Sequence, residues 1–460
     1  MRASILLSIA GICVASLVGA ETVPFRVHGQ AWDYVGRIMQ SSDTLLGDGA
    51  TPIELSHNSM QSLGGQITLE ADLGEHWKGA FGIGAYQAAN ALGTYQGSNT
   101  ASPNFLNAST FKPYIAEANL TYLLGSRENP WFSVTVGNFA FDYNSDVKDL
   151  GLYLLRGPVY PGLLMSGFRQ FETDSTKSTQ TGFHLHHSLG NLSQDLLLIN
   201  ERELPPTYDW SVAYIAKYRA LNALEIGAGV NFYRLIPYSE RLETPGRVSG
   251  NGVALDGTSN FEEVSPGDTV FYTHQGIKLM ARFALDLKRW LSFGNMGAED
   301  FKLYGEAAIL GVKDYGSYYD DVMERMPIMG GFNIPTFGVL DFLSVEVEWY
   351  GSPYKNDLYN IGNPSSIVGP WQNQNPPVPS PVPVLPGAYK DSTRDDVKWA
   401  VVVQKTVAKH VRFTAQVAND HYRAAPVVSD GAGITSVGGT ASALTSPGDW
   451  YFMFRLGFFF

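Results

Sequence analysis

The chain has 460 residues, of which 44% are hydrophobic, 17% charged and 13% aromatic, with 48 glycines and a mean hydropathy of -0.08. The low charge excludes a disordered chain, and the near-neutral hydropathy excludes a helical membrane protein. The formal net charge of -12, without any basic run, excludes a nucleic-acid partner. Many glycines and aromatics at neutral hydropathy favour a barrel with one face toward lipid and one toward water.

Residues 1–20 are predicted to be a signal peptide. Arg2 is the charged start, residues 5–17 form the apolar core, and Val18-Gly19-Ala20 is the small-residue cleavage site. The only cysteine, Cys13, lies inside this segment, so the mature chain is expected to have no disulfide. No later stretch is apolar for about twenty residues, the length that a spanning helix needs. Residues 21–460 are therefore expected to form one domain that crosses the membrane as strands.

Strict alternation of apolar and polar residues predicts long strands along the chain. The clearest are 63–73 and 277–287, and others cover 114–122, 224–232, 397–404 and 411–417. In the strand 277–287, Phe283 is expected to face lipid and Met280 the lumen. A soluble β-sandwich also alternates, but the predicted strands exceed the usual 5–6 residues or so of soluble sheets and approach membrane-spanning length.

The connections between these strands alternate between short turns and long polar segments, as in outer-membrane barrels. Counting strands through this alternation predicts an all-β, transmembrane, antiparallel up-and-down β-barrel of about 16 strands, with 14 or 18 as the neighbouring even counts. The short turns belong to the periplasmic rim and the long loops to the extracellular rim.

One long loop, 352–394, contains a proline-rich run at 375–386 that is expected to be extended polyproline II over the barrel mouth. A partner-binding segment is the alternative for this run.

The last strand ends in alternating aromatic residues. Its outward face comprises Trp450, Phe452, Phe454, Leu456, Phe458 and Phe460. This pattern, with its terminal Phe460, resembles the C-terminal strand of bacterial outer-membrane β-barrels. The resemblance implies that Phe454, Leu456, Phe458 and Phe460 are an assembly signal read by the barrel-assembly machinery.

The third long loop, 142–180, has an apolar middle that needs burial, and the inner wall of a wide barrel offers it. The mature chain is in this respect similar to the general bacterial porins, in which the third loop narrows the pore. The resemblance implies an outer-membrane location, contact with outer-membrane lipids and passage of small hydrophilic solutes, and it leaves a homotrimer open. A surface binding or adhesion protein that uses the barrel as an anchor is the alternative function.

Charged residues are the candidates for a pore constriction, because opposed charges at close quarters select solutes. The acidic side would be Asp142, Asp146, Asp149 and Glu172. The basic side would be the lumen-facing Arg26, Lys398, Arg412 and Arg455. In the alternative interpretation these are ordinary solvated lumen residues that pair with Glu346 and Glu348.

No catalytic motif appears, and no enzyme activity or cofactor is expected. His184 and His186 share one strand face at a spacing that suits a metal, but no third ligand stands out nearby in the sequence. They are interpreted as polar lumen residues, and no metal site is expected.

Overall fold

The computed structural model of the chain describes residues 23–41, 44–46, 52–54, 56–57, 59–90, 111–127, 130–155, 178–201, 208–238, 261–265, 268–271, 275–290, 295–312, 321–351, 396–420, 444 and 446–460. The expected signal peptide at 1–20, Glu172 and the proline-rich run at 375–386 lie outside these residues. Within the described residues, no helix has the length and apolar content needed to cross a membrane.

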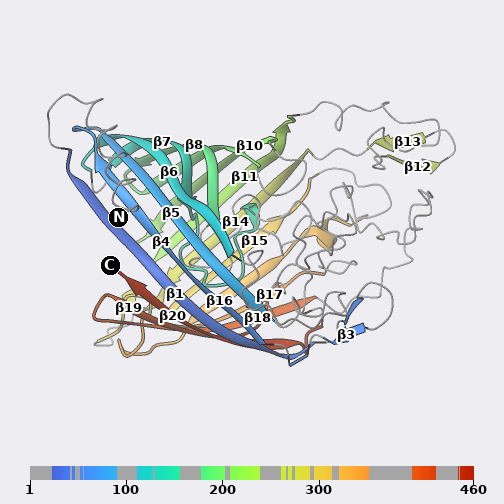
Figure 1. Cartoon of the computed structure of the whole chain (residues 1–460). Helices are drawn as coiled ribbons and strands as arrows, with labels where there is room; N and C mark the ends of the chain where they lie inside the picture. The colour runs from blue at the N-terminus through green and yellow to red at the C-terminus, as the bar shows by residue number, and fades with distance from the viewer. Residues whose placement is uncertain are drawn as a thin grey trace.

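Sixteen antiparallel strands form one closed barrel, which confirms the predicted fold class and the predicted strand number (Figure 1). Neighbours in the chain are neighbours in the wall, so the topology is up-and-down. The strands are β1 Phe25–Gln40, β4 Ser59–Asp72, β5 Trp77–Asn90, β6 Phe111–Gly125, β7 Pro130–Phe141, β8 Ser178–Leu189, β9 Leu192–Asn200, β10 Trp210–Leu221, β11 Leu224–Ile236, β14 Gly276–Asp286, β15 Lys302–Ile309, β16 Ile328–Asn333, β17 Phe342–Trp349, β18 Val397–Val407, β19 Val411–Asn419 and β20 Trp450–Phe459.

Two small hairpins stand apart from the barrel sheet. β2 (Thr44–Leu46) pairs with β3 (Pro52–Glu54) in the connection between β1 and β4, and β12 (Phe261–Ser265) pairs with β13 (Asp268–Phe271) in the connection between β11 and β14. Both hairpins lie at the end of the barrel opposite to the C-terminal residue (Figure 1).

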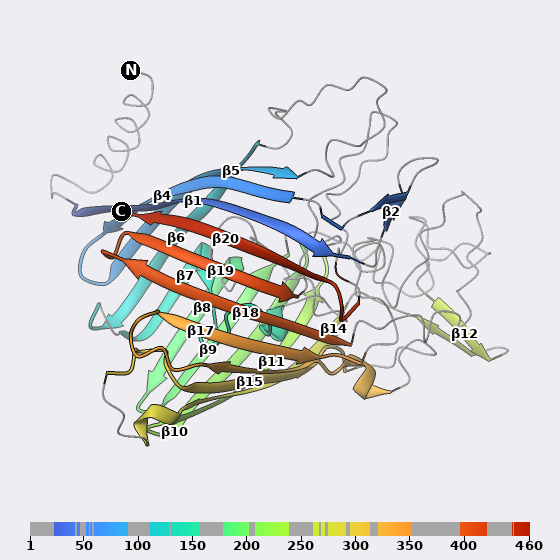
Figure 2. The same cartoon turned by 90° about the horizontal axis from the view of Figure 1, so that it is seen from below.

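The first and last strands close the ring. β1 pairs with β20 from Gln30↔Phe459 to Gln40↔Trp450, and Figure 2 shows the two strands side by side. The backbone N–H of Phe460 donates to the carbonyl of Gly29 at 3.1 Å, and the N–H of Gly29 donates to the carbonyl of Phe460 at 3.0 Å. Closure matters because an open sheet edge has unpaired backbone groups that lipid cannot satisfy.

The barrel wall is apolar outside and mostly polar inside. On β14, Leu279 and Phe283 are exposed on the outside, whereas Lys278, Met280 and Arg282 point inward and are buried. The outward members of the other strands repeat this exposed apolar belt, including Ile67, Phe81, Ile83, Leu196, Val347 and Phe454. A continuous exposed apolar surface of this kind fits contact with lipid rather than water.

The predicted direction of Met280 is correct, but its expected surroundings are wrong. Met280 is only 4% exposed and packs in a hydrophobic cluster inside the barrel, instead of facing a water-filled lumen. The segment that covers it, residues 142–155, follows β7.

Candidate functional site

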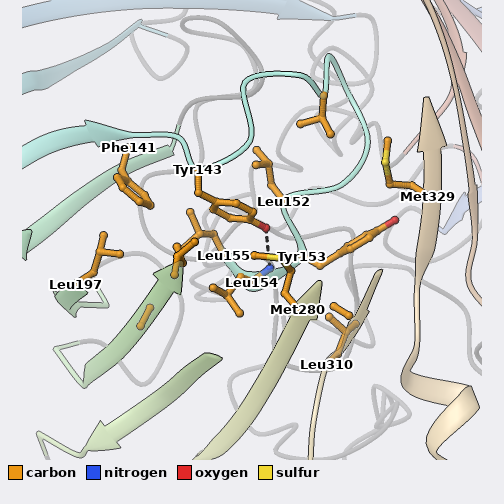
Figure 3. Packing of buried hydrophobic residues seen from close by; sticks show 14 of the residues in the cluster. Phe141, Tyr143, Leu152, Tyr153, Leu154, Leu155, Leu197, Met280, Leu310 and Met329 are labelled. Carbon is orange, nitrogen blue, oxygen red and sulfur yellow. Dashed lines mark hydrogen bonds between the residues drawn. The ribbon is translucent and has the colours of Figure 1, made fainter. Parts of the chain in front are cut away.

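An inner segment, residues 142–155, leaves the end of β7 and packs against the inside of the barrel wall. Its Tyr143, Val147, Leu150 and Leu152–Leu155 are each at most 2% exposed. They form one cluster with inward side chains of several strands: Phe139, Phe141, Leu197, Ile199, Ala213, Ile215, Met280, Tyr304, Ala308 and Met329 (Figure 3). Apolar side chains on a connection are thereby removed from water, which stabilises this placement by roughly 1.5–3 kcal/mol for each fully buried large side chain.

Local turns give the inner segment its path. The carboxylate of Asp142 accepts from the N–H of Asn144 at 2.8 Å, which starts the turn away from β7. Gly151 (φ +86°) and Leu152 (φ +58°) both adopt the left-handed region, and the short helical turn η3 (Tyr153–Leu155) follows. A side chain at position 151 would be strained by this φ and would approach Val147 at 3.2 Å.

Two buried glutamates of the wall hold the inner segment by accepting its donors. Glu306 on β15 accepts from the Tyr143 hydroxyl at 2.6 Å, from the Asn144 amide at 2.8 Å and from the Tyr153 N–H at 2.8 Å. Glu346 on β17 accepts from the consecutive N–H groups of residues 148, 149 and 150 at 2.6–2.9 Å. These bonds satisfy donors that burial would otherwise leave unpaired.

A third glutamate and a tyrosine extend this network. The Tyr153 hydroxyl donates to Glu348 at 2.7 Å, and the Tyr304 hydroxyl donates to Glu346 at 2.7 Å. Glu346 and Glu348 are both 0% exposed. These two carboxylates are therefore enclosed between the wall and the inner segment.

Ion pairs with β14, with β15 and with the residues just before β15 also anchor the inner segment. Asp146 contacts Arg282 at 3.1 Å and Lys302 at 3.4 Å, while Lys148 contacts Glu299 at 3.1 Å. Burial opposes ionisation of Glu299, but the ammonium groups of Lys148 and Lys302 outweigh it and lower the pKa of this carboxyl group. The described part of the loop is thus held by charge as well as by packing.

Three of the four acidic candidates for the constriction belong to the inner segment. Asp142 forms the first turn, Asp146 binds the two cations of β14 and β15, and the N–H of Asp149 donates to Glu346 at 2.9 Å. The placement of Glu172 is outside the described residues.

The basic candidates lie on another arc of the wall, made of β1 and β18–β20. Arg26 has a 65% exposed side chain and pairs with Glu70 and Asp72 at 3.6 and 3.5 Å. Lys398 is buried and donates to the carbonyl of Leu444 at 2.6 Å. The guanidinium carbons of Arg412 and Arg455 lie 4.5 Å from the Phe459 ring centre and 5.8 Å from the Trp32 ring centre, respectively.

The residues proposed as an assembly signal lie along β20 and its end. Phe454, Phe458 and Phe460 are exposed on the outside of the barrel, at 56%, 46% and 61%. Phe460 is also tied to Gly29 of β1 by the two backbone bonds described above.

A cluster on β8 and β9 contains a residue that sequence reasoning missed. His184 and His186 both contact one carboxylate oxygen of Asp195, which lies on the neighbouring strand. Their ligand-type atoms lie within 4.8 Å of one another. The signal was present in the sequence, because the tight turn Gly190-Asn191 pairs position 186 with position 195 across the hairpin.

Comparison with known proteins gave structural likeness only. No protein-family model matches the chain, and no curated protein sequence matches it. Among solved structures, the chain is similar to engineered variants of the porin of Rhodopseudomonas blastica, with 9% sequence identity, 95% of this chain and 100% of the porin covered, and TM-scores of 0.41, 0.42 and 0.40.

Proposed function

We propose that this protein is an outer-membrane porin through which small hydrophilic solutes diffuse passively or with weak selectivity. The observation that carries the proposal is an inner segment fixed against one arc of a closed barrel of sixteen strands. A barrel of about this size is wide enough to enclose an aqueous channel. A segment packed against one part of the wall narrows such a channel. Its buried side chains and its hydrogen bonds to the wall keep it in that position.

The apolar belt on the outside of the barrel supports a membrane location. Exposed Ile67 on β4, Leu196 on β9 and Val347 on β17 belong to strands spread around the ring, and each would be a liability in water. Because the fold is a closed barrel of strands, the outer membrane is the proposed site.

Charges on the inside supply the proposed weak selectivity. The acidic candidates Asp142, Asp146 and Asp149 belong to the inner segment, while Lys398, Arg412 and Arg455 belong to the arc of β18–β20. Solutes that pass between the inner segment and the guanidinium groups of Arg412 and Arg455 would meet charges of opposite sign, which is how narrow pores discriminate. Lys398 is buried and does not face them.

Single-channel recording of the refolded protein in a planar bilayer tests the proposal. We expect stepwise conductance that persists at low voltage and rises with salt concentration. Barrels that insert without conducting would contradict the porin function, and specific binding of intact cells or matrix by such barrels would favour the anchor alternative.

The basic arc has its own test in the same recordings. The double variant Arg412→Ala, Arg455→Ala should shift the reversal potential in a salt gradient toward cation selectivity, because two positive charges leave the lumen wall. The variant Arg127→Ala is the matched control, since its guanidinium pairs with Asp72 just after the end of β6 and was not among the constriction candidates. Unchanged reversal potentials in the double variant would remove these residues from the selectivity site.

A further inference from the structure

The imidazoles of His184 and His186 converge on the carboxylate of Asp195 inside the barrel. His184 Nε2 lies 2.9 Å, and His186 Nδ1 lies 2.8 Å, from the same oxygen, Oδ1 of Asp195. Two imidazoles and one carboxylate are a donor set that binds zinc and related transition metals in proteins. We propose that His184, His186 and Asp195 form a binding site for a divalent transition-metal ion, independently of the pore function.

The separations of the ligand atoms are close to those that a metal ion requires. Bonds of roughly 2.0–2.2 Å in a tetrahedral arrangement place ligand atoms roughly 3.3–3.6 Å apart. The two nitrogen–oxygen contacts are slightly shorter than this, and all three ligand atoms lie within 4.8 Å. Small side-chain rotations, without any movement of the strands, therefore open the space for an ion.

The strands and their neighbours hold the ligands in place. His186 and Asp195 are cross-strand partners in the β8–β9 ladder, and His184 is two residues along the same face of β8. The His184 ring packs between Phe139 and Phe141, with centroid distances of 5.7 and 4.9 Å. Support of this kind fixes the orientation of a ligand before the ion arrives.

Metal binding requires each imidazole to carry its proton on the ring nitrogen that faces away from Asp195. In the present arrangement each imidazole donates an N–H to Asp195, so the lone pair needed by a metal is on the other ring nitrogen. Binding moves each proton to that other nitrogen and frees the nitrogen that faces Asp195. For His186 the relocated proton on Nε2 meets Ser188 Oγ at 3.0 Å, which then accepts it.

The exposure of the three ligands and a neighbouring lysine influence how tightly the metal ion would bind. The His186 side chain is 26% exposed and that of Asp195 is 5% exposed, so the ion would enter from the histidine side and keep water in its open positions. Lys217 on β10 lies 3.9 Å from the second oxygen of Asp195. Its ammonium repels a cation at this point, and it must move aside when an ion binds.

Zinc titration of the refolded full chain in detergent, followed by isothermal calorimetry, tests the site. We expect one zinc ion per chain, with affinity reduced about tenfold or more in His184→Ala and in Asp195→Asn. The control is His187→Ala on the same strand, whose ring packs against Trp131 instead; it should bind zinc as the original chain does. Circular dichroism and gel mobility of unheated samples verify that each variant is a folded barrel.

The variant Lys217→Gln separates a metal site from a purely structural cluster. Removing the ammonium should tighten zinc binding severalfold, because the ion no longer competes with a cation for Asp195. A histidine–carboxylate cluster with no metal function predicts no change in this experiment. Absence of zinc binding at millimolar concentration, equal affinity in the His184→Ala chain, or equal affinity in the Lys217→Gln chain would each overturn the proposal.

Discussion

At the scale of single residues, buried carboxylates in the wall decide where the inner segment lies. Glu346 is 0% exposed and accepts from three consecutive backbone N–H groups as well as from Tyr304. A buried carboxylate is costly unless its hydrogen bonds are complete, and here the segment itself completes them. The dependence is mutual, because the same N–H groups would be orphaned without the carboxylate.

Replacing Glu346 should therefore release the inner segment. Glu346→Ala leaves the N–H groups of residues 148–150 without an acceptor, at a cost of about 1–3 kcal/mol for a buried unsatisfied group. We expect faster hydrogen exchange of these amides and larger, noisier single-channel conductance. Glu225→Ala is the control, since Glu225 pairs with Arg282 but does not touch the segment's backbone. Exchange rates that do not change at 148–150 would contradict the anchoring role.

A second residue-scale prediction concerns Asp300, in the turn before β15 and outside the spanning strands. Its carboxylate accepts from the N–H of Gly297 at 2.8 Å and from the hydroxyl of Thr336 at 2.9 Å. Burial opposes its ionisation, but these and further hydrogen bonds outweigh burial and lower its pKa. The stabilisation is therefore complete above the unfolded pKa of about 3.9 and is lost as pH falls through the lower folded pKa.

The variant Asp300→Asn tests whether the stabilisation by Asp300 is lost at low pH. The melting temperature of the variant should fall below that of the original chain at pH 6, and the difference should shrink as the pH falls below about 4. Thermal melts followed by circular dichroism between pH 3 and 7 measure the difference. A difference of the same size at every pH would contradict the linkage.

At the scale of elements, the strands are what the sequence predicts best. Alternation with period two identifies β4, β14, β18 and β19 and assigns their inner and outer faces, because each strand exposes apolar side chains on one side only. The hairpins β2–β3 and β12–β13 were not predicted, since such short strands carry too few residues for a period to emerge. The partners of the inner segment were not predicted either, because contacts such as Tyr143 with Glu306 join positions far apart in the chain.

Neighbouring positions on β4 offer a matched test of the two faces. Ile67→Lys places a charge on the exposed apolar outside and should cost about 2–4 kcal/mol if it reaches the bilayer midplane. Gln66→Lys, on the inward face beside Tyr114, should cost much less. Unfolding by denaturant in lipid vesicles compares the two variants, and equal costs would reverse the assignment of faces.

Phe283 and Met280 on β14 should both be sensitive to a lysine, but for different reasons. Phe283→Lys should lose about 2–4 kcal/mol at the midplane. Met280→Lys should also be strongly destabilising, because Met280 lies among the buried side chains that hold the inner segment. The same unfolding measurement applies, and a well-tolerated Met280→Lys would contradict the packing of the inner segment on β14.

At the scale of the whole molecule, closure of the ring depends on the last few residues. The carbonyl and N–H of Phe460 both bond to Gly29, and a Cβ at position 29 would meet the Phe460 ring at 2.5 Å. The close approach of the two ends thus needs a glycine at position 29 of β1, beside the aromatic ring of Phe460. The alternation in the sequence predicted the aromatic face that ends in Phe460. The role of Gly29 could not be predicted, because it depends on the register between β1 and β20 in the closed barrel.

Deletion of Phe460 should reduce the yield of assembled barrels in cells. The deletion removes two backbone bonds of the β1–β20 seam and one residue of the proposed assembly signal. The fraction of heat-modifiable barrel in outer-membrane preparations measures the effect, and refolding of the purified variant in detergent separates loss of stability from loss of recognition. Full assembly in cells without Phe460 would contradict the signal.

The seam between β1 and β20 also determines the sequence of events during folding. As long as β20 is unpaired, both β1 and β19 present open edges that can pair with another chain. The contact that removes these edges joins residues near opposite ends of the chain, which makes it the slowest kind of contact to form. Partly folded chains should therefore persist long enough to aggregate, and a helper that occupies the edge of β1 would protect them until β20 arrives.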